Sequence, residues 1–319
     1  MHSRSSDRSA ASATGADPLA EVIRLLRPQT VLSKIVSGRG QWSVRYAAHE
    51  EPSFGIVLEG SCLLEPEGIG TLELEQGDFV FFPMTPAFTM ATDLALKPVP
   101  GSPARVEEVR HGAKTGSASF RMLGGFFRFD RANAELLGRF LPPVVLVRRS
   151  EPGAKRLRRL VELIGEEAPE ERPGRDLILE RLVEVLLVEA LRFRSASARQ
   201  PEAGFLAGLA DPALARALRR FHDDVAQRWT VASLARAAGM SRAVFAERFT
   251  RKVGMPPMHY LLEWRLALAK DLLRRARTPL AEVAEKIGYQ SASAFSTAFT
   301  RHVGFPPSAF VRRSAADAA

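Results

Sequence analysis

Near its C-terminus the chain reads LARAAGMSRAVFAERFTRKVGMPP over residues 234–257 and VAEKIGYQSASAFSTAFTRHVGFPP over residues 283–307. The two copies lie 49 residues apart at Gly239 and Gly288, and 50 residues apart at Phe245 and Phe295. The one-residue difference falls in the turn, where an insertion costs little. Each copy predicts a helix, a glycine turn and a second helix. A tandem pair of such units is typical of proteins that read DNA.

Each unit carries residues suited to begin and end its helices. Thr230 and Thr278 are predicted to cap the first helices, with Pro279 at a first helical position, and Ser241 and Ser291 to cap the second helices. The two glycines supply the left-handed backbone of the turn. Apolar residues at helical spacing are expected to face the core: Phe245, Phe249, Val253, Phe295, Phe299 and Val303.

A long helix from about Pro257 to Arg275 is predicted between the two units. Its apolar face is formed by Tyr260, Leu261, Trp264, Leu268 and Leu272. About 20 helical residues span roughly 30 Å, which is close to the roughly 34 Å of one DNA turn. Two reading helices at its ends can therefore enter successive major grooves on one side of a duplex.

Solvent-side positions of the second helices are the candidates for contact with DNA. The candidates for base edges are Arg242, Ala243, Ala246, Glu247, Ser293, Ser296 and Thr297. Arginine pairs with guanine and glutamate accepts from cytosine. The candidates for phosphate are Arg248, Arg251, Lys252, Arg265, Arg301 and His302. The alternative for any one of these positions is a surface residue that does not contribute to DNA binding.

The net charge of +9 is concentrated in the segment that carries the repeat. Residues 211–319 hold 18 lysines and arginines against 9 acidic residues, whereas the rest of the chain holds 27 of each. A polyanionic partner such as double-stranded DNA would favour this distribution. Charge alone would equally fit a solvated arginine-rich face, so the interpretation depends on the repeat.

The front of the chain has the pattern of short strands. Apolar runs at residues 54–60, 62–68, 71–83 and 124–130 are bounded by Gly, Pro and Asp. Many short strands with frequent turns predict an antiparallel sandwich or barrel. Residues 97–117 are expected to form a long polar loop.

Two helices are predicted after this region, at residues 154–164 and 175–194, followed by a linker at residues 195–204. The second helix has a wide apolar stripe made of Leu179, Leu182, Val183, Leu186, Leu187, Ala190 and Leu191. That stripe fits either a core against the sheet or the seam of a homodimer. Residues 151–200 are therefore a helical linker with a dimerisation role left open.

Residues 211–313 resemble the DNA-binding domain of the AraC/XylS family of bacterial transcription regulators. The resemblance lies in LARAAGMS, EWRLALAKDLL, VAEKIGYQSASAFSTAFTRHVGFPP and the GMPP and GFPP turns. It implies two helix-turn-helix units, at about 230–254 and 279–304, whose second helices both read the major groove. Thr297 stands where many relatives carry arginine, so readout by the second unit is expected either to be weaker or to rest on hydroxyl and methyl contacts. The resemblance also makes RNA polymerase a candidate partner.

Residues 18–150 are similar to the cupin-like sensor domain found fused to that domain, most clearly in GDFVFFPMTPAF at residues 77–88. The expected fold is therefore α+β: an antiparallel, jelly-roll type β-barrel, then helices, then an all-α double helix-turn-helix domain. The first cupin motif, SFGIVLEG, lacks histidines, and Phe88 stands where the second would carry one. No metal, cofactor or enzymatic activity is expected. The interior can hold a small-molecule effector or simply be filled by its own side chains: Trp42, Phe54, Phe81, Phe88 and Met90.

The remaining features concern location. Residues 1–17 are rich in Ser and Ala and are expected to be a disordered arm without the apolar core of a secretory signal. Cys62 is the single cysteine, so no intrachain disulfide can form, and a buried apolar role in a reducing cytoplasm is expected. No uncharged run is long enough to cross a membrane.

These observations favour a sequence-specific, effector-responsive transcription regulator. One alternative is a cupin-type metalloenzyme with a DNA-binding tail, which would need metal ligands that the motifs do not contain. Another is a nonspecific DNA binder. Such a protein relies on a high density of basic residues alone, whereas the repeat predicts shaped reading helices, one of which carries the acidic Glu247.

Overall fold

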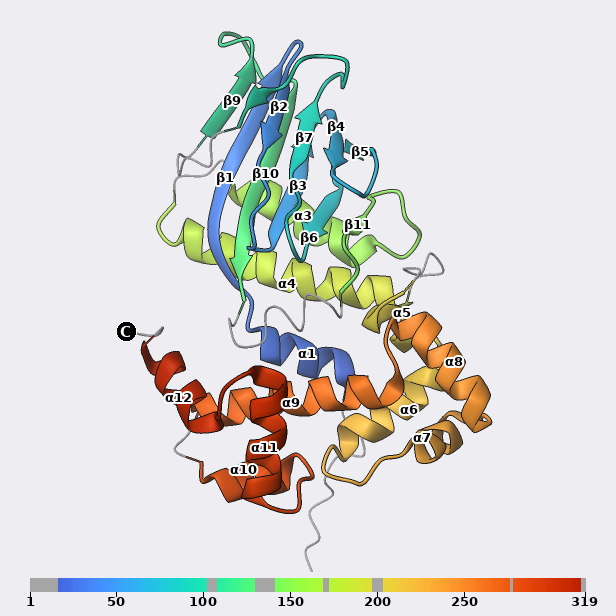
Figure 1. The fold of residues 1–319 in the computed structure, drawn as a ribbon. Helices are drawn as coiled ribbons and strands as arrows, with labels where there is room; N and C mark the ends of the chain where they lie inside the picture. Colours follow the sequence, from blue (N-terminus) through green and yellow to red (C-terminus); the bar gives the residue numbers. More distant parts are fainter. Residues whose placement is uncertain are drawn as a thin grey trace, which may run out of the picture.

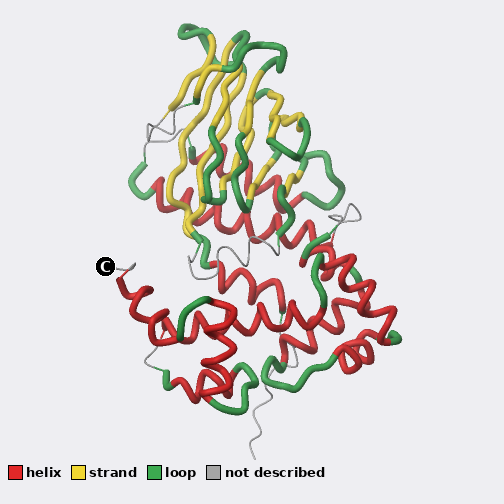
Figure 2. The backbone as a smooth tube through the Cα atoms, in the orientation of Figure 1, coloured by secondary structure: helices red, strands yellow, loops and turns green. Residues whose placement is uncertain are grey.

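The structure, a computed structural model, describes residues 17–101, 108–129, 141–168, 172–196, 203–275 and 278–316. Strands gather in the N-terminal half and helices in the C-terminal half (Figures 1 and 2). The predicted mixed α+β class is confirmed. Apart from Asp17, the predicted N-terminal arm lies outside the described residues.

The β-rich half consists of two sheets. One has the order β11 (Val145–Val147), β6 (Phe79–Phe82), β3 (Ser53–Glu59), β10 (Phe120–Arg128), β1 (Gln29–Arg39) and β9 (Glu108–Gly112). The other has the order β5 (Leu72–Glu75), β4 (Ser61–Pro66), β7 (Phe88–Ala91), β2 (Ser43–Tyr46) and β8 (Val99–Pro100). Within the described part of the chain no strand pairing joins the two sheets, so closure into a barrel stays a prediction.

The six-stranded sheet is buried on both faces. All four residues of β6 are buried. Because neighbouring side chains of a strand point to opposite faces, Phe79 and Phe81 pack toward the helices, while Val80 and Phe82 pack toward the second sheet. Helices α3 (Lys155–Glu167) and α4 (Arg175–Ala196) cover the helix side (Figure 1). The apolar stripe of α4 lies in this core, with Leu182 at its half-buried margin, so the stripe is core and not a free dimer seam.

The strand predictions were incomplete in two places. The run at residues 71–83 is two strands, β5 and β6, because Gly77 takes φ +91° and turns the chain between them. Within residues 97–117, predicted as a loop, β8 and β9 pair in parallel with β2 and β1. These two strands are short, and none of their residues is buried, so pairing with a neighbouring strand rather than burial makes them strands.

The helical half is organised around α9 (Pro257–Arg275), whose bounds agree with the prediction. The other helices are α1 (Pro18–Leu26), α5 (Phe205–Ala210), α6 (Pro212–Asp223), α7 (Val231–Ala238), α8 (Arg242–Val253), α10 (Leu280–Lys286), α11 (Ala292–Val303) and α12 (Pro307–Ala316). Figure 1 shows α8 beside one end of α9 and α10–α12 around the other.

Two separate cores hold these helices. One continuous apolar core runs from the helix side of the six-stranded sheet through α3, α4 and α5 into α6–α8, and it includes Tyr260 and Trp264 of α9. The second core joins α10–α12 to the other half of α9 through Leu266 and Leu273. The first reading unit therefore shares a core with the sheet, whereas the second has its own.

Candidate nucleic-acid interface

The turns of the two predicted reading units have the same backbone geometry. Gly239 takes φ +72° and Gly288 takes φ +82°, a left-handed conformation that only glycine adopts at low cost. The amide that follows each glycine donates to the carbonyl five residues earlier, from Met240 to Ala235 at 2.9 Å and from Tyr289 to Ala284 at 2.8 Å. The two turns therefore begin alike, and the one-residue insertion falls after this hydrogen bond, between Tyr289 and the capping Ser291.

Three of the four predicted helix caps are present. Thr230 caps α7 in a reciprocal capping box with Ser233. Ser241 caps α8 by accepting from the Val244 amide at 3.4 Å, and Ser291 caps α11 in the same way. The fourth prediction, Thr278, was wrong. Helix α10 begins at Leu280, so Pro279 occupies the cap position and no side chain caps the helix.

The predicted base-reading side chains lie on the outer side of α8 and α11, opposite the buried phenylalanines. Phe245, Phe249, Phe295 and Phe299 are at most 1 % exposed. The exposed candidates are Arg242, Ala243, Glu247, Ser293 and Thr297, and the half-buried ones are Ala246 and Ser296. Both helices therefore present an exposed face, which begins at the capping serine and extends to Glu247 in α8 and to Thr297 in α11.

Sequence reasoning missed one residue of this face. Val244 lies in the first turn of α8 and is 53 % exposed. The available signal was the residue type and position: Val244 is a β-branched apolar residue in the first turn of a helix that buries its phenylalanines instead.

The predicted phosphate contacts divide into two groups. Arg251, Arg301 and His302 are exposed, and Lys252 is half-buried, all in the last turns of α8 and α11. Arg251 also lies 3.5 Å from Glu247 in an exposed pair of little energetic weight.

The other two predicted phosphate contacts hold the fold together. The guanidinium of Arg248 lies 2.6 Å from the buried carboxylate of Asp211, which caps α6. Arg265 donates to the Val225 carbonyl at 2.8 and 3.0 Å and to the Gln227 carbonyl at 2.7 Å. These bonds fix α8 to α6 and α9 to the loop before α7. Both arginines therefore support the fold, and their contact with phosphate stays a prediction.

Comparison with known proteins agrees with this geometry. The Cupin family matches residues 17–194 and a helix-turn-helix domain family matches residues 234–313. A putative AraC-like transcription regulator from Streptomyces lividans is 38 % identical over 283 residues, covering 88 % of this chain and 93 % of its own. The chain belongs to the AraC-like transcription regulators. It is a DNA-binding transcription regulator with an N-terminal cupin domain.

More distant relatives are of the same kind. The HTH-type transcriptional regulator AlkR of Acinetobacter baylyi is 28 % identical over 271 residues and covers 82 % of this chain and 88 % of its own. Among solved structures, the DNA-binding domain of AdpA in complex with a target DNA is 30 % identical. That match covers 34 % of this chain and 96 % of that one, with a TM-score of 0.32.

The AraC-like regulator has an apolar cavity of about 370 Å³ between its two sheets. Phe88 and Met90 line it, as predicted, and Phe54 borders it while its ring contacts Phe127 on the helix side. Trp42 lies in the same core, where it stacks on His111 and contacts the tilted ring of Phe120, and it is not part of the cavity lining. Phe81 points to the opposite face of the sheet. Successive side chains of β6 alternate between the two faces, and Phe81 lies with Phe79 on the helix side.

The remaining sequence predictions concern reactive groups. Cys62 is 4 % exposed, and burial raises the pKa of its thiol to about 12, which confirms its buried apolar role. In the described ranges of the regulator, no cluster of three or more His, Cys, Asp or Glu side chains could bind a metal ion. In the same ranges no helix has the length and apolar character needed to span a bilayer.

Proposed function

We propose that α8 and α11 read base edges in two successive major grooves of one DNA duplex. The observation that carries this proposal is the repeated exposed face, which begins at a capping serine in both helices and lies opposite buried phenylalanines. Helix α9 separates the units by 19 residues, or about 28 Å at about 1.5 Å per residue. That separation is compatible with one turn of B-DNA, roughly 34 Å.

The two helices use different chemistry. In the first unit Arg242 reads guanine, Glu247 accepts from cytosine, and Val244 contacts a thymine methyl group. In the second unit the hydroxyl groups of Ser293, Ser296 and Thr297 read the bases. Four cations in the last turns hold phosphates and set the register: Arg251, Lys252, Arg301 and His302.

The apolar cavity between the sheets is the proposed effector site. Its lining is dominated by apolar side chains from both sheets, including Val36, Phe82, Phe88, Met90 and Met122. A cavity of this size suits a small apolar molecule. Helices α3 and α4 pack on strands of the six-stranded sheet and lie within the cupin match, which ends at residue 194. We therefore place residues 18–150 and the helices up to residue 196 in one sensor unit, and residues 211–313 in the DNA-binding domain.

The test of two-groove reading starts from a genome-wide map of bound sites and a footprint on one of them. We expect two protected patches on one side of the duplex. Inserting about five base pairs, half a helical turn, between them should weaken binding strongly, whereas inserting about ten should weaken it less. Equal affinity for all three spacings would show that a single unit does the reading.

The effector site can be tested separately with the apolar fluorescent anion 1-anilinonaphthalene-8-sulfonate. A Cβ added at Gly124 would make only ordinary contacts, the nearest at 3.8 Å, so G124V should fold and narrow the cavity. We expect saturable fluorescence enhancement with the wild type and its loss in G124V. Equal enhancement in both proteins would place the probe elsewhere.

A further inference from the structure

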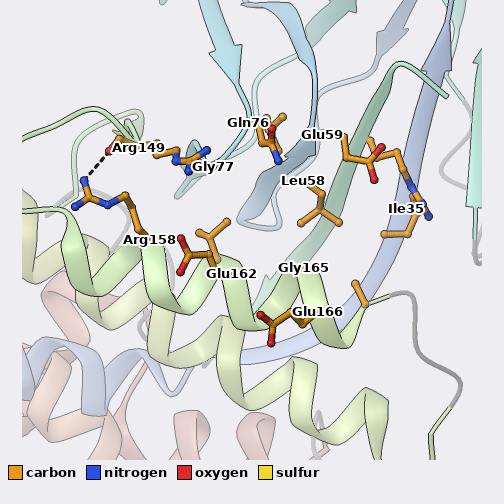
Figure 3. Close-up of a pocket in the computed structure, with 14 residues that line it drawn as sticks. Ile35, Leu58, Glu59, Gln76, Gly77, Arg149, Arg158, Glu162, Gly165 and Glu166 are labelled. Atoms are coloured by element: carbon orange, nitrogen blue, oxygen red, sulfur yellow. Dashed lines mark hydrogen bonds between the residues drawn. The ribbon is translucent and has the colours of Figure 1, made fainter.

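A second cavity, of about 380 Å³, lies on the other face of the six-stranded sheet, between that sheet and α3 (Figure 3). Its floor is apolar and includes Ile35, Leu58 and Val161. Its walls carry three arginines and three glutamates: Glu59, Arg121, Arg149, Arg158, Glu162 and Glu166. The apolar cavity has no comparable set of charges, so the two spaces suit different molecules.

The charged side chains of this polar cavity are not used by the fold. Among the described residues, no ion pair joins any of the six to another side chain, although Glu59 and Arg121 are cross-strand neighbours. The single side-chain hydrogen bond among them runs from Arg158 to the backbone carbonyl of Arg149, at 3.0 Å. Arg121 and Arg158 are half-buried, and the other four lie exposed at the rim, so charged groups outside any ion pair of the described fold are available to a ligand.

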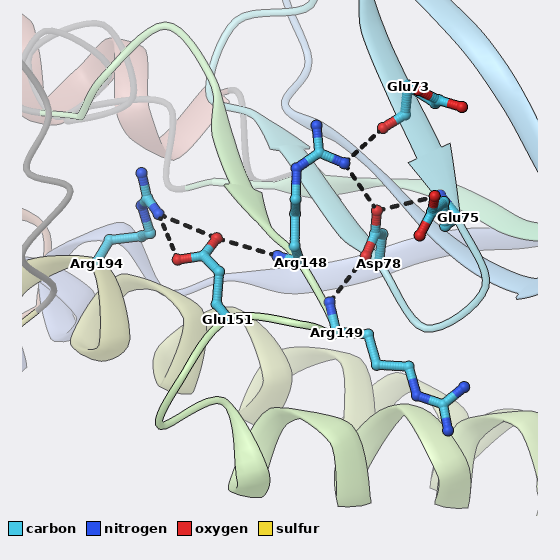
Figure 4. A network of polar contacts seen from close by, with 7 residues as sticks. All are labelled: Glu73, Glu75, Asp78, Arg148, Arg149, Glu151 and Arg194. Carbon is cyan, nitrogen blue, oxygen red and sulfur yellow. Dashed lines mark hydrogen bonds and ion pairs between the residues drawn. The ribbon is translucent and has the colours of Figure 1, made fainter.

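One end of the polar cavity is built by a buried polar network (Figure 4). Asp78, whose side chain is 3 % exposed, accepts from the Arg149 amide at 2.8 Å and from the Glu75 amide at 3.1 Å. Glu151 accepts from the Arg148 amide at 3.2 Å and pairs with Arg194. The network fixes the backbone from which the Arg149 side chain extends.

Gly77 completes this end of the cavity. A Cβ at Gly77 would lie 2.6 Å from Cδ of Arg149, so the arginine stem lies directly over the glycine. Arg149 and Arg158 therefore lie together at one end, and Glu59 lies at the other, with Glu166 on the α3 side (Figure 3).

Gly165 keeps the middle of the polar cavity open. It lies inside α3, where glycine costs about 0.5–1 kcal/mol relative to alanine. A Cβ at this position would come no closer than 3.8 Å to Leu58, which is an ordinary contact. Since alanine would fit, packing does not require the glycine. Its effect is to leave space beside the apolar floor.

We propose that this cavity binds a zwitterionic small molecule with a short apolar body. Its acid group lies at the guanidinium of Arg149, beside Arg158, because a guanidinium group binds a carboxylate well. Its cationic group lies toward Glu59 and Glu166, and its body covers Leu58 and Val161. A ligand with one charge only would pair with one end of the cavity and leave the charges at the other end to water, so we expect it to bind more weakly. The site is independent of the DNA-reading proposal.

The probe is 6-aminohexanoate, compared with hexanoate and hexylamine, in calorimetric titrations of the full chain. We expect saturable binding of the zwitterion, at least about tenfold tighter than either singly charged analogue, because each charged hydrogen bond adds about tenfold or more to affinity. Comparable binding of hexanoate or hexylamine would overturn the proposal. Absence of binding by ω-amino acids of four to eight carbons would overturn it as well.

Variants locate the binding. R158Q and E166Q should each weaken 6-aminohexanoate by about tenfold, and G165L should abolish binding by filling the space. R156Q is the matched control, because Arg156 lies on the same helix, is 72 % exposed and contacts Glu189 outside the cavity. G124V, in the apolar cavity, should also bind normally. Full affinity in R158Q and E166Q would exclude this cavity even if G165L failed to fold.

Discussion

The two reading units of this regulator are nearly the same in backbone and differ in their surroundings. Both have a left-handed glycine turn, a serine cap and two buried phenylalanines. The first unit, however, lies in the continuous core that reaches the sheet, whereas the second has a core of its own. Similar local sequence therefore gives similar local structure but different coupling to the sensor.

The coupling of the first unit follows a short path of packed elements. Helix α4 packs on β1, α5 packs on α4, and α8 packs on α5. The amide of Gly204 donates to the carbonyl of Lys252 at 2.8 Å, which ties the start of α5 to the end of α8. In addition, Glu21 of α1 lies 2.6 Å from the buried His222 of α6. We therefore expect a change in the cupin domain to reach the first reading helix directly and the second through α9.

The two reading faces also differ in charge. Arg242 and Glu247 of the first unit align with Ala292 and Thr297 of the second. Charged groups make stronger and more base-specific hydrogen bonds than hydroxyl groups. We expect the first unit to set most of the sequence specificity and the second to add register and affinity.

The largest expected difference concerns stability. Phe249 and Phe299 occupy equivalent buried positions, and truncation of either to alanine should cost about 3–5 kcal/mol. F249A should lower the unfolding temperature of the sensor together with the first unit. F299A should produce a separate early transition that leaves the sensor intact. Scanning calorimetry distinguishes the two, and one transition shifted equally by both variants would refute the two-core description.

The next effect concerns DNA binding. R242A and E247A should each weaken binding to a natural site by about 1–3 kcal/mol and relax base preference at one position. S293A and T297A should cost less, about 0.5–1.5 kcal/mol. Titrations on wild-type and single-base-substituted sites measure both, with R156A as the control. A larger loss in the second unit would reverse the assignment of roles.

A smaller effect tests the unequal helix caps. T230A removes a capping side chain and should destabilise the first unit by about 1 kcal/mol. T278A removes no cap and should change stability by less than about 0.5 kcal/mol. Denaturant unfolding of both variants gives the values. Equal losses would mean that Thr278 supports α10 in another way.

The smallest expected effect is a pH dependence confined to the first unit. Burial lowers the pKa of His222 below its ordinary value, more than Glu21 raises it. The unfolded chain therefore binds a proton more readily, so this contribution to stability is present above pH about 6.5 and is lost as the pH falls below it. Denaturant unfolding between pH 7.5 and 5.5 should show the loss in the wild type. In H222Q the free energy of unfolding should depend less on pH. An unchanged pH dependence would mean that another group causes it.

Much of the helical half could be predicted because its signals are local. Periodic apolar residues, glycine turns and serine caps are each decided within a few residues, and they placed α7, α8, α9 and α11 correctly. The predicted cap of α10 was wrong because the helix begins one residue later than expected, which puts Pro279 rather than Thr278 at the cap position. The roles of Arg248 and Arg265 could not be predicted, since their partners lie 37 and 40 residues away in the chain.

The β-rich half was less predictable for the same reason. The side of the sheet that Phe81 faces depends on strand register and on which face the helices cover. The strands β8 and β9 depend on neighbours distant in sequence. The two cavities are likewise made by elements that meet only after folding, and the polar one needs a buried carboxylate to hold Arg149 in place.

The amino-acid sequence by itself determined that this chain carries two reading units, and where each helix of a unit turns, because those features depend on short-range sterics and hydrogen bonds. Tertiary structure alone decided which arginines remain at the surface, which aromatic side chains line a cavity, and which unit shares a core with the sensor. Those outcomes depend on long-range packing, in which a residue's partners are set by the topology of the whole chain.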